Sequence, residues 1–481
     1  MPQSKVFKGV VWASVQRFGT MIISFVTNIV LARLLTPDDF GTIGMLLLFL
    51  AVANTFVDSG FGSALIQKKD ANETDFSTVF YINLGLSLVV YAILFLGAPW
   101  VARFYDVDIL RPLLRAQGLV LILHAFSIIQ TAILRKKMDF RKLSICNLIG
   151  NIVGSIIGIG AALMDYGVWS LVIRTLTVGL TTSLLLWFIG SWKPLLVFSK
   201  QSSKELFGFG GFMLLSSIVY SFTNNIQTLI MGKLFTPGVL GNYTQAHQLR
   251  NVATDSISSV IAQVLYPDFA NNQNNDEELL ARLLFSVRII SYIVIAIMFI
   301  CILVASPLIQ VLYGQKWLDC IPYFKILCVS GVFVALQDVN INIIAAKGKS
   351  KMLFYYNLCK IVAFMVLMYV GAKLGGVMGF IWGINSYTLL AWVVFAAVAS
   401  YVLHSNLWKQ LLIVSRNIII AFIPFIIVLV LSKAIPQDLS NILTIIIDTT
   451  LFLLLLGILS YIIKDKVFCY LLDKNRHIVG L

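Results

Sequence analysis

Charged residues are scarce in this 481-residue chain: they make up 12% of it, whereas 59% of the residues are hydrophobic. A soluble domain usually carries about twice that share of charge. The short alternating segments of a membrane strand barrel are also absent. Apolar runs of about twenty residues, long enough to cross a bilayer as a helix, recur throughout the sequence. The sequence therefore predicts an all-α polytopic membrane protein.

Motifs for catalysis, metals and nucleotides are lacking too. The six cysteines form no C-x-x-C pair, and the four histidines match no metal-ligand spacing. Neither a G-x-S-x-G elbow nor a Walker A loop occurs. We therefore expect no enzyme activity, no cofactor and no metal. The net charge of +14 resides in short basic clusters between apolar runs, which favours membrane topology over nucleic acid as its explanation.

One turn motif occurs twice, 200 residues apart. The stretch Arg33–Gly41 (RLLTPDDFG) returns as Lys233–Gly241 (KLFTPGVLG), and Pro112–Arg115 returns as Pro322–Lys325 with a shift of 210. In both copies of the turn, threonine suits the N-cap and proline the first position of a new helix. Such helix starts are common enough to match by chance. The constant order of the matches favours a duplicated unit of roughly two hundred residues.

We predict about 14 transmembrane helices, arranged as two six-helix bundles followed by two extra helices. The expected spans are 8–32, 40–64, 78–101, 111–134, 143–164, 167–190, 207–231, 241–265, 285–306, 322–345, 353–372, 377–402, 413–432 and 441–463.

The predicted domains are residues 1–204, residues 205–405, and residues 406–481 with the extra helices and a tail. An even number of spans per repeat makes the repeat parallel, with its axis along the membrane normal. Most basic residues lie in loops on the same side of the membrane as the N-terminus. Because such loops are usually cytoplasmic, both termini are expected in the cytoplasm. The first span carries Arg17 and has no convincing cleavage site, so we read it as an uncleaved helix.

Several cations lie where the membrane should be. The predicted spans contain Arg17, Arg174, Arg250, Lys325 and Lys360. A cation at mid-membrane costs about 2.5–3.5 kcal/mol, so each either reaches toward an interface or faces a polar interior. Arg115 and Lys325 each follow a helix-starting proline by three residues, where the helix dipole disfavours a cation. The same unfavourable placement of a cation in both halves indicates an anionic ligand and a shared cationic lumen.

The segment 241–265 is too polar for an ordinary span, yet the repeat places a membrane helix there. One face of that helix would carry His247, Asn251, Thr254, Asp255 and Ser258. A soluble connecting segment is the alternative; we favour a helix lining a water-filled lumen, with Asn224 and Asn225 contributing from the preceding span. Asp58, Asp255 and Asp338 are candidates for proton coupling or for ion pairs with arginines.

Three stretches resemble a known family. The segments Leu31–Gly41, Asp58–Gln67 and Leu312–Trp317 are similar to Wzx-type flippases, the polysaccharide transporters of the multidrug/oligosaccharidyl-lipid/polysaccharide superfamily. The resemblance implies a two-lobed bundle that works by alternating access. It further implies transport of undecaprenyl-pyrophosphate-linked oligosaccharide across the bacterial inner membrane, for O-antigen, capsule or exopolysaccharide. A cationic lumen suits a pyrophosphate because arginine offers two donors to one phosphate.

The resemblance also sets the expected partners. They are the lipid-linked oligosaccharide substrate and membrane lipids, with a glycan polymerase and glycosyltransferases as further candidates and no nucleic acid. Two alternatives remain. A multidrug antiporter of the same superfamily should have an acidic, aromatic lumen. A membrane glycan polymerase or ligase should have a large outer loop, which this sequence lacks.

Overall fold

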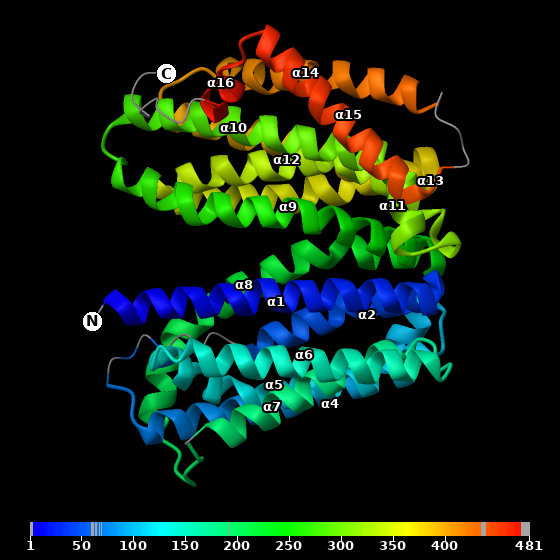
Figure 1. The fold of residues 1–481 in the computed structure, drawn as a ribbon. Helices are drawn as coiled ribbons and strands as arrows, with labels where there is room; N and C mark the ends of the chain where they lie inside the picture. Colours follow the sequence, from blue (N-terminus) through cyan, green and yellow to red (C-terminus); the bar gives the residue numbers. More distant parts are fainter. Residues whose placement is uncertain are drawn as a thin grey trace. The chain divides into compact units, whose positions relative to one another are not determined.

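The structure is a computed structural model. It describes residues 3–58, 62, 65–66, 68, 70–190, 192–433 and 439–472, with the backbone alone described at 3–6, 201–213, 215–216, 255–264, 350–351, 354, 357–358 and 470–472. These residues form long helices without strands (Figure 1). The helices are α1 (Gln3–Leu34), α2 (Pro37–Asp58), α4 (Glu73–Tyr105), α5 (Leu110–Lys136), α6 (Phe140–Leu163), α7 (Trp169–Ile189), α8 (Lys200–Leu234), α9 (Pro237–Asn271), α10 (Asp276–Leu303), α11 (Ala305–Leu312), η1 (Gln315–Trp317), α12 (Cys320–Ala346), α13 (Ser350–Val402), α14 (Trp408–Ser432), α15 (Asn441–Ile462) and α16 (Lys466–Leu472).

The predicted helix starts after the two Thr-Pro turns are confirmed. The helix α2 begins at Pro37, and α9 begins at Pro237. At the first turn, Thr36 and Asp39 cap each other. The Thr36 backbone N–H donates to Asp39 Oδ2 over 2.9 Å, and the Asp39 N–H donates to Thr36 Oγ1 over 3.3 Å. This reciprocal arrangement satisfies two of the amide groups that a helix start leaves open.

The all-α membrane architecture is confirmed, while the number of spans stays a prediction. Among the described residues, eleven helices are long and apolar enough to cross a membrane. The helices α8 and α9, each 35 residues long, are not among those eleven. Two predicted spans are joined in α13, which departs from helical geometry at Gly375 and at Gly376, whose φ is 57°. Glycine tolerates that left-handed conformation at little cost.

The chain forms two compact units, which we name unit 1 (Met1–Gly241) and unit 2 (Asn242–Leu481). The predicted domain boundaries after 204 and 405 stay a prediction. In unit 1, α6 and α7 pack very closely. A Cβ at Gly154 would lie 3.0 Å from the Arg174 carbonyl oxygen, and one at Gly158 would lie 2.6 Å from Arg174 Cβ. Small residues permit such close backbone approach between membrane helices.

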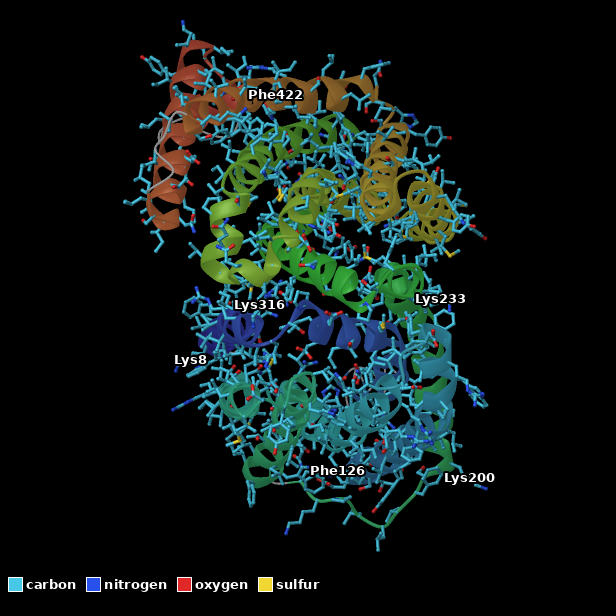
Figure 2. All side chains as sticks on the ribbon, turned by 90° about the vertical axis from the view of Figure 1, so that its right-hand side faces the viewer. Lys8, Phe126, Lys200, Lys233, Lys316 and Phe422 are labelled. Carbon is cyan, nitrogen blue, oxygen red and sulfur yellow. The ribbon has the colours of Figure 1, made fainter. Side chains whose placement is uncertain are left out.

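An aromatic cluster holds α4, α5 and α7 together in unit 1. The Phe80 ring lies 5.8 Å from the rings of Phe126 and Trp192 and 5.9 Å from that of Trp187, in edge-on geometry. Gln130 Nε2 donates to the Trp192 carbonyl oxygen over 2.9 Å. Phe126 is labelled in Figure 2. Because these side chains occupy one side of α5, its other side is left to line a cavity.

The two copies of the turn motif contact each other reciprocally within unit 1. A Cβ built on Gly41 would lie 1.7 Å from the Pro237 carbonyl oxygen, and one on Gly241 would lie 1.8 Å from the Pro37 carbonyl oxygen. No side chain fits at either position, so each glycine lets the backbones of α2 and α9 touch.

In unit 2, buried polar side chains tie the two C-terminal helices to α10. Asn417 on α14 is buried, and its Nδ2 donates to Ser291 Oγ over 2.7 Å. On α15, the buried Ser460 Oγ lies 2.8 Å from the Tyr292 hydroxyl, within hydrogen-bonding distance. Phe299 and Phe425 stack with their ring centroids 4.9 Å apart. The helices α14 and α15 are therefore specifically docked parts of unit 2.

Candidate functional site

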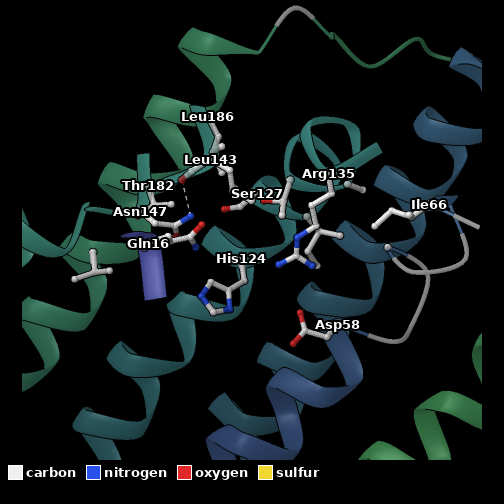
Figure 3. Close-up of a pocket in the computed structure, with 16 residues that line it drawn as sticks. Gln16, Asp58, Ile66, His124, Ser127, Arg135, Leu143, Asn147, Thr182 and Leu186 are labelled. Carbon is white, nitrogen blue, oxygen red and sulfur yellow. Dashed lines mark hydrogen bonds between the residues drawn. The ribbon is translucent and has the colours of Figure 1, made fainter. Parts of the chain in front are cut away.

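A cavity of about 420 Å³ lies inside the helical bundle of unit 1 (Figure 3). It is bordered by α1, α2, α5, α6 and α7. Its polar lining residues are Gln16, Asp58, His124, Ser127, Thr131, Arg135, Asn147 and Thr182. The apolar part of its lining is Gly62, Ile66, Ile128, Ala132, Leu143, Val178, Gly179 and Leu186. A cavity of this size is within the range of small-ligand sites.

One side of the cavity carries uncharged polar groups. Asn147 Nδ2 donates to the Leu143 carbonyl oxygen over 2.8 Å, and Ser127 Oγ donates to the Leu123 carbonyl oxygen over 3.0 Å. The first of these bonds is drawn in Figure 3. Each side chain thereby donates a hydrogen bond within its own helix, and its oxygen lone pairs stay available to a ligand. This side can therefore accept hydrogen bonds from hydroxyl groups.

The other side carries three ionisable groups from two helices. Asp58 is the last residue of α2, and His124 and Arg135 lie on α5. Figure 3 shows the three side chains turned toward a common space. His124 and Arg135 both lie within electrostatic range of the Asp58 carboxylate. Among the described residues, no direct ion pair engages Arg135 or Asp58, so both remain available to a ligand.

Arg174 lies one helical turn beyond this cavity on α7. It precedes the cavity-lining residue Val178 by four positions, so the two share a helix face. The side chain is half-buried, and its Nε is buried without a hydrogen-bond partner among the described residues. A buried guanidinium atom that lacks a partner is costly, so Arg174 is a strong candidate for contact with an anionic ligand.

The other predicted cations of the first half do not line this cavity. Arg17 is exposed on α1. Arg115 Nε donates to the Phe95 carbonyl oxygen over 3.1 Å, and its guanidinium lies 4.2 Å from the centre of the Phe95 ring. A cation–π contact accounts for the position of Arg115 without an anion. In unit 2, Lys325 is exposed on α12. The proposed ligand role of these three cations stays a prediction.

A second polar group lies on α9 in unit 2. Arg250 is only 6% exposed, and Gly331 of α12 packs beside it. His247 stacks on Tyr243 with ring centroids 5.7 Å apart, and Asn251 Nδ2 lies 3.4 Å from His247 Nδ1. The predicted shared face of His247 and Asn251 is therefore present. Ser258 and Asp255 lie in α9, but their side chains are outside the described residues.

Lys360 on α13 lies between two aromatic rings and an acid. Its Nζ is 5.9 Å from the centre of the Tyr387 ring and 5.8 Å from that of Phe395. Asp338 of α12 acts on it electrostatically. The pairing of Asp338 with a cation stays a prediction.

Two predicted lumen asparagines lie on α8. Asn224 is exposed, and Asn225 Nδ2 donates to the Ser221 carbonyl oxygen over 2.8 Å. This bond is a local one within the helix. A role for these asparagines in a lumen stays a prediction.

His124 and Arg135 are site residues that the sequence reasoning missed. The four histidines match no metal-ligand spacing, and the basic clusters between apolar runs indicate only membrane topology. A signal was available: the predicted topology places the ends of the second and fourth spans, near Asp58 and Arg135, on the same side of the membrane. Opposite charges at neighbouring helix ends then become candidates for one site.

A cysteine pair on α5 tests whether water reaches the cavity. In a variant without the native cysteines, we expect a cysteine replacing His124 to react with a membrane-impermeant maleimide at least tenfold faster than one replacing Ala125. The reason is that His124 lines the cavity, whereas Ala125 is 0% exposed. Labelling rates on inverted membrane vesicles provide the measurement. Equal rates for the two cysteines would contradict a hydrated cavity.

Three curated proteins align with most of this chain. The teichuronic acid biosynthesis protein TuaB of Bacillus subtilis (strain 168) is 24% identical and covers 87% of the chain and 88% of its own length. The lipopolysaccharide biosynthesis protein WzxC of Escherichia coli (strain K12) is 24% identical over 78% of this chain and 77% of its own. The succinoglycan biosynthesis transport protein ExoT of Rhizobium meliloti (strain 1021) is 26% identical over 98% and 96%.

Solved structures share the fold at low sequence identity. The lipid II flippase MurJ in an inward closed conformation has a TM-score of 0.76 at 13% identity, with 95% of this chain and 100% of MurJ covered. An inward-facing multidrug resistance MATE transporter of the MOP superfamily has a TM-score of 0.65 at 16% identity, covering 82% of this chain and 98% of the transporter. The family model described as "Polysaccharide biosynthesis protein" matches residues 30–322. This match spans more than half of the sequence, and the chain therefore belongs to that family of polysaccharide biosynthesis proteins.

Proposed function

We propose that this protein is a flippase that moves undecaprenyl-pyrophosphate-linked oligosaccharide across the bacterial inner membrane. The cargo is a repeat unit of O-antigen, capsule or exopolysaccharide. Three relatives support this proposal, because they are named for the biosynthesis of teichuronic acid, lipopolysaccharide and succinoglycan, and ExoT is named as a transport protein. The fold that the chain shares with MurJ, a lipid II flippase, gives further support.

The observation that carries the proposal is the cavity of unit 1. Ionisable side chains inside a membrane bundle are costly and therefore usually functional. Here Ser127, Asn147 and their neighbours present oxygen acceptors opposite Asp58 and Arg135. Sugar hydroxyls can donate hydrogen bonds to these oxygen acceptors. Both the Asp58 carboxylate and the Arg135 guanidinium can also bind sugar hydroxyls. A polar head group can thus leave water without losing its hydrogen bonds.

The predicted topology supplies the direction. With the N-terminus in the cytoplasm, the Asp58 end of α2 and the Arg135 end of α5 lie on the cytoplasmic side. The cavity then faces the leaflet in which the lipid-linked oligosaccharide is assembled. Alternating access delivers the head group to the other side, while the lipid tail stays in the bilayer.

The cations beyond the cavity suit the pyrophosphate. Within unit 1, Arg174 provides a buried donor one turn past the cavity wall. Within unit 2, taken by itself, Arg250 and Lys360 are further candidates because of their charge. Arginine binds phosphate oxygens through two parallel N–H groups. In this proposal the other three predicted cations, Arg17, Arg115 and Lys325, contact the substrate along its path and not in the cavity.

The multidrug antiporter is the weaker alternative. It requires an acidic and aromatic lumen, but the lining of the unit 1 cavity, as far as its residues are described, places one carboxylate, Asp58, beside His124 and Arg135 and includes no Phe, Tyr or Trp. In the proposed pathway, glycosyltransferases supply the substrate and a glycan polymerase consumes it. The flippase itself performs no bond chemistry, so transport is driven by an ion gradient or by that consumption.

Filling the cavity tests the proposal. We expect Ser127→Trp to reduce surface glycan at least tenfold in a deletion strain complemented with the variant, because the indole would occupy the space of the head group. The matched control is Leu180→Trp on α7, since Leu180 is 47% exposed and lies outside the cavity. Glycan is normalised to the amount of membrane protein. Normal export by Ser127→Trp would refute a role for the cavity in transport.

A further inference from the structure

A second cavity, of about 300 Å³, lies in unit 2 where the start of α10 meets α16. Its lining residues are Glu277, Leu280, Ala281, Leu284, Phe285, Arg288 and Lys466. Five of the seven come from the first three turns of α10 and present an apolar wall with a carboxylate at its outer end. The two cations, Arg288 and Lys466, come from different helices. The cavity shares no residue with the transport cavity of unit 1.

Arg288 is placed by a buried asparagine of α14. Asn417 is 2% exposed, and its Nδ2 donates to the Arg288 carbonyl oxygen over 3.0 Å and to Ser291 Oγ over 2.7 Å. These bonds fix the turn of α10 that carries the guanidinium. The guanidinium itself forms no ion pair with a carboxylate among the described residues, and it lines the cavity.

Lys466 is held in place by Arg416, the residue of α14 that precedes Asn417. Arg416 Nη2 pairs with Asp465 Oδ2 over 2.7 Å, and the Asp465 side chain is 1% exposed. The other Asp465 oxygen accepts the Val467 backbone N–H over 2.9 Å, and Val467 is 2% exposed. Lys466 thus stands between two immobilised residues. Consecutive residues of α14 therefore hold in place the two cations that line this cavity.

The charge balance of this cavity favours an anion. Of the carboxylates in the described part of the chain, the lining includes only Glu277, which is exposed and pairs with neither cation. Asp465 is satisfied by Arg416 and by backbone amides, so it does not neutralise Lys466. The cavity consequently has a surplus of positive charge beside an apolar wall. That combination fits a molecule with an anionic head and a hydrocarbon tail.

The predicted topology puts this cavity at the cytoplasmic surface of the membrane. The chain after Arg288 is the apolar body of α10, and Lys466 follows the last predicted span by three residues. Both cations therefore lie at head-group depth. The cytoplasmic leaflet carries anionic lipids, and basic pockets between helices on that side bind their head groups.

We propose that this cavity binds an anionic phospholipid of the cytoplasmic leaflet. Its phosphate lies between the Arg288 guanidinium and the Lys466 ammonium, and an acyl chain follows Leu280 and Leu284 along α10. Arginine contacts the phosphate through two donors, and lysine adds a point charge. The bound lipid joins α10 to α16 and so stabilises the docking of the C-terminal helices.

The experiment measures lipid binding by the purified full-length protein with native mass spectrometry and a thermal melt. Phosphatidylglycerol is titrated against phosphatidylcholine. We expect Arg288→Gln combined with Lys466→Gln to weaken phosphatidylglycerol binding about 30-fold, because each interfacial charge contributes about fivefold. The matched control is Lys137→Gln combined with Lys349→Gln, which removes two exposed cations outside the cavity and should leave binding unchanged.

Two further variants keep the test decisive if the double variant folds poorly. Arg288→Lys with Lys466→Arg retains both charges and should keep binding within about threefold. Ala281→Trp retains both cations but fills the cavity, so it should abolish the phosphatidylglycerol-dependent rise in melting temperature. Unchanged binding in both the charge-removal and the cavity-filling variants would overturn the proposal. So would a preference of the cavity for undecaprenyl pyrophosphate that phosphatidylglycerol cannot displace.

Discussion

Replacing Arg174 by alanine is expected to lower surface glycan export by one to two decades while leaving the melting temperature unchanged or higher. The Arg174 Nε is buried without a partner among the described residues. Removing such a group relieves a desolvation cost, so the protein without bound substrate loses no stability. Transport, however, loses a charge-assisted contact worth about 1.5–3 kcal/mol, which corresponds to the predicted loss of affinity.

The two readouts separate a ligand role from a structural role. Arg174→Lys retains the charge without the planar donor pair and should export at an intermediate level. The control is Arg103→Ala, which removes an exposed arginine from the last turn of α4 and should export normally. Surface glycan is measured in the complemented deletion strain, and melting is followed on purified protein. Normal export together with a lower melting temperature would show that Arg174 only supports packing against α6.

A side chain at Gly41 is expected to prevent folding. A Cβ there would lie 1.7 Å from the Pro237 carbonyl oxygen, and backbone cannot move aside as a flexible side chain can. Overpacking usually costs about 1–3 kcal/mol, and a clash with backbone should reach at least the upper end of this range. We expect Gly41→Leu to reduce the monodisperse protein recovered from membranes at least tenfold, and Gly241→Leu to behave alike because the contact is reciprocal.

Gly85→Leu is the matched control for this prediction. Gly85 also lies within a membrane helix, α4, but a Cβ built on it meets nothing within 4 Å. Its substitution should leave the yield unchanged or slightly raised, because glycine disfavours helix. Size-exclusion chromatography of the solubilised protein gives the measurement. If Gly41→Leu and Gly85→Leu gave equal yields, the close approach of the two turn motifs would be wrong.

The sequence alone predicted the helices, because the signals that define them are local. A run of about twenty apolar residues has few alternatives to a membrane helix, and a Thr-Pro pair favours a helix start at the proline. The starts at Pro37 and Pro237 were therefore predictable, as was a helix over the polar segment of α9. The resemblance to polysaccharide transporters likewise rested on short stretches such as Leu31–Gly41, and the family match includes all of that segment.

The composition of the site was decided by the tertiary structure. A helical pattern shows which residues share a face, but it does not show which other helix that face meets. The intramembrane cations looked equivalent in the sequence, yet Arg115 contacts the Phe95 ring, whereas Arg174 has a buried Nε one turn beyond the cavity. His124 and Arg135 join Asp58 only because α2 and α5 end side by side.

The close approach of Gly41 to Pro237 also depends on tertiary structure. The repeated turn showed that a glycine recurs in each copy, but backbone contact between the copies arises from their packing. The same holds for Arg416 and Asn417, two adjacent residues that hold different helices in place. Local sequence determines where helices form because their hydrogen bonds are local. Packing alone decides which side chains share a space, because those contacts join residues far apart in the chain.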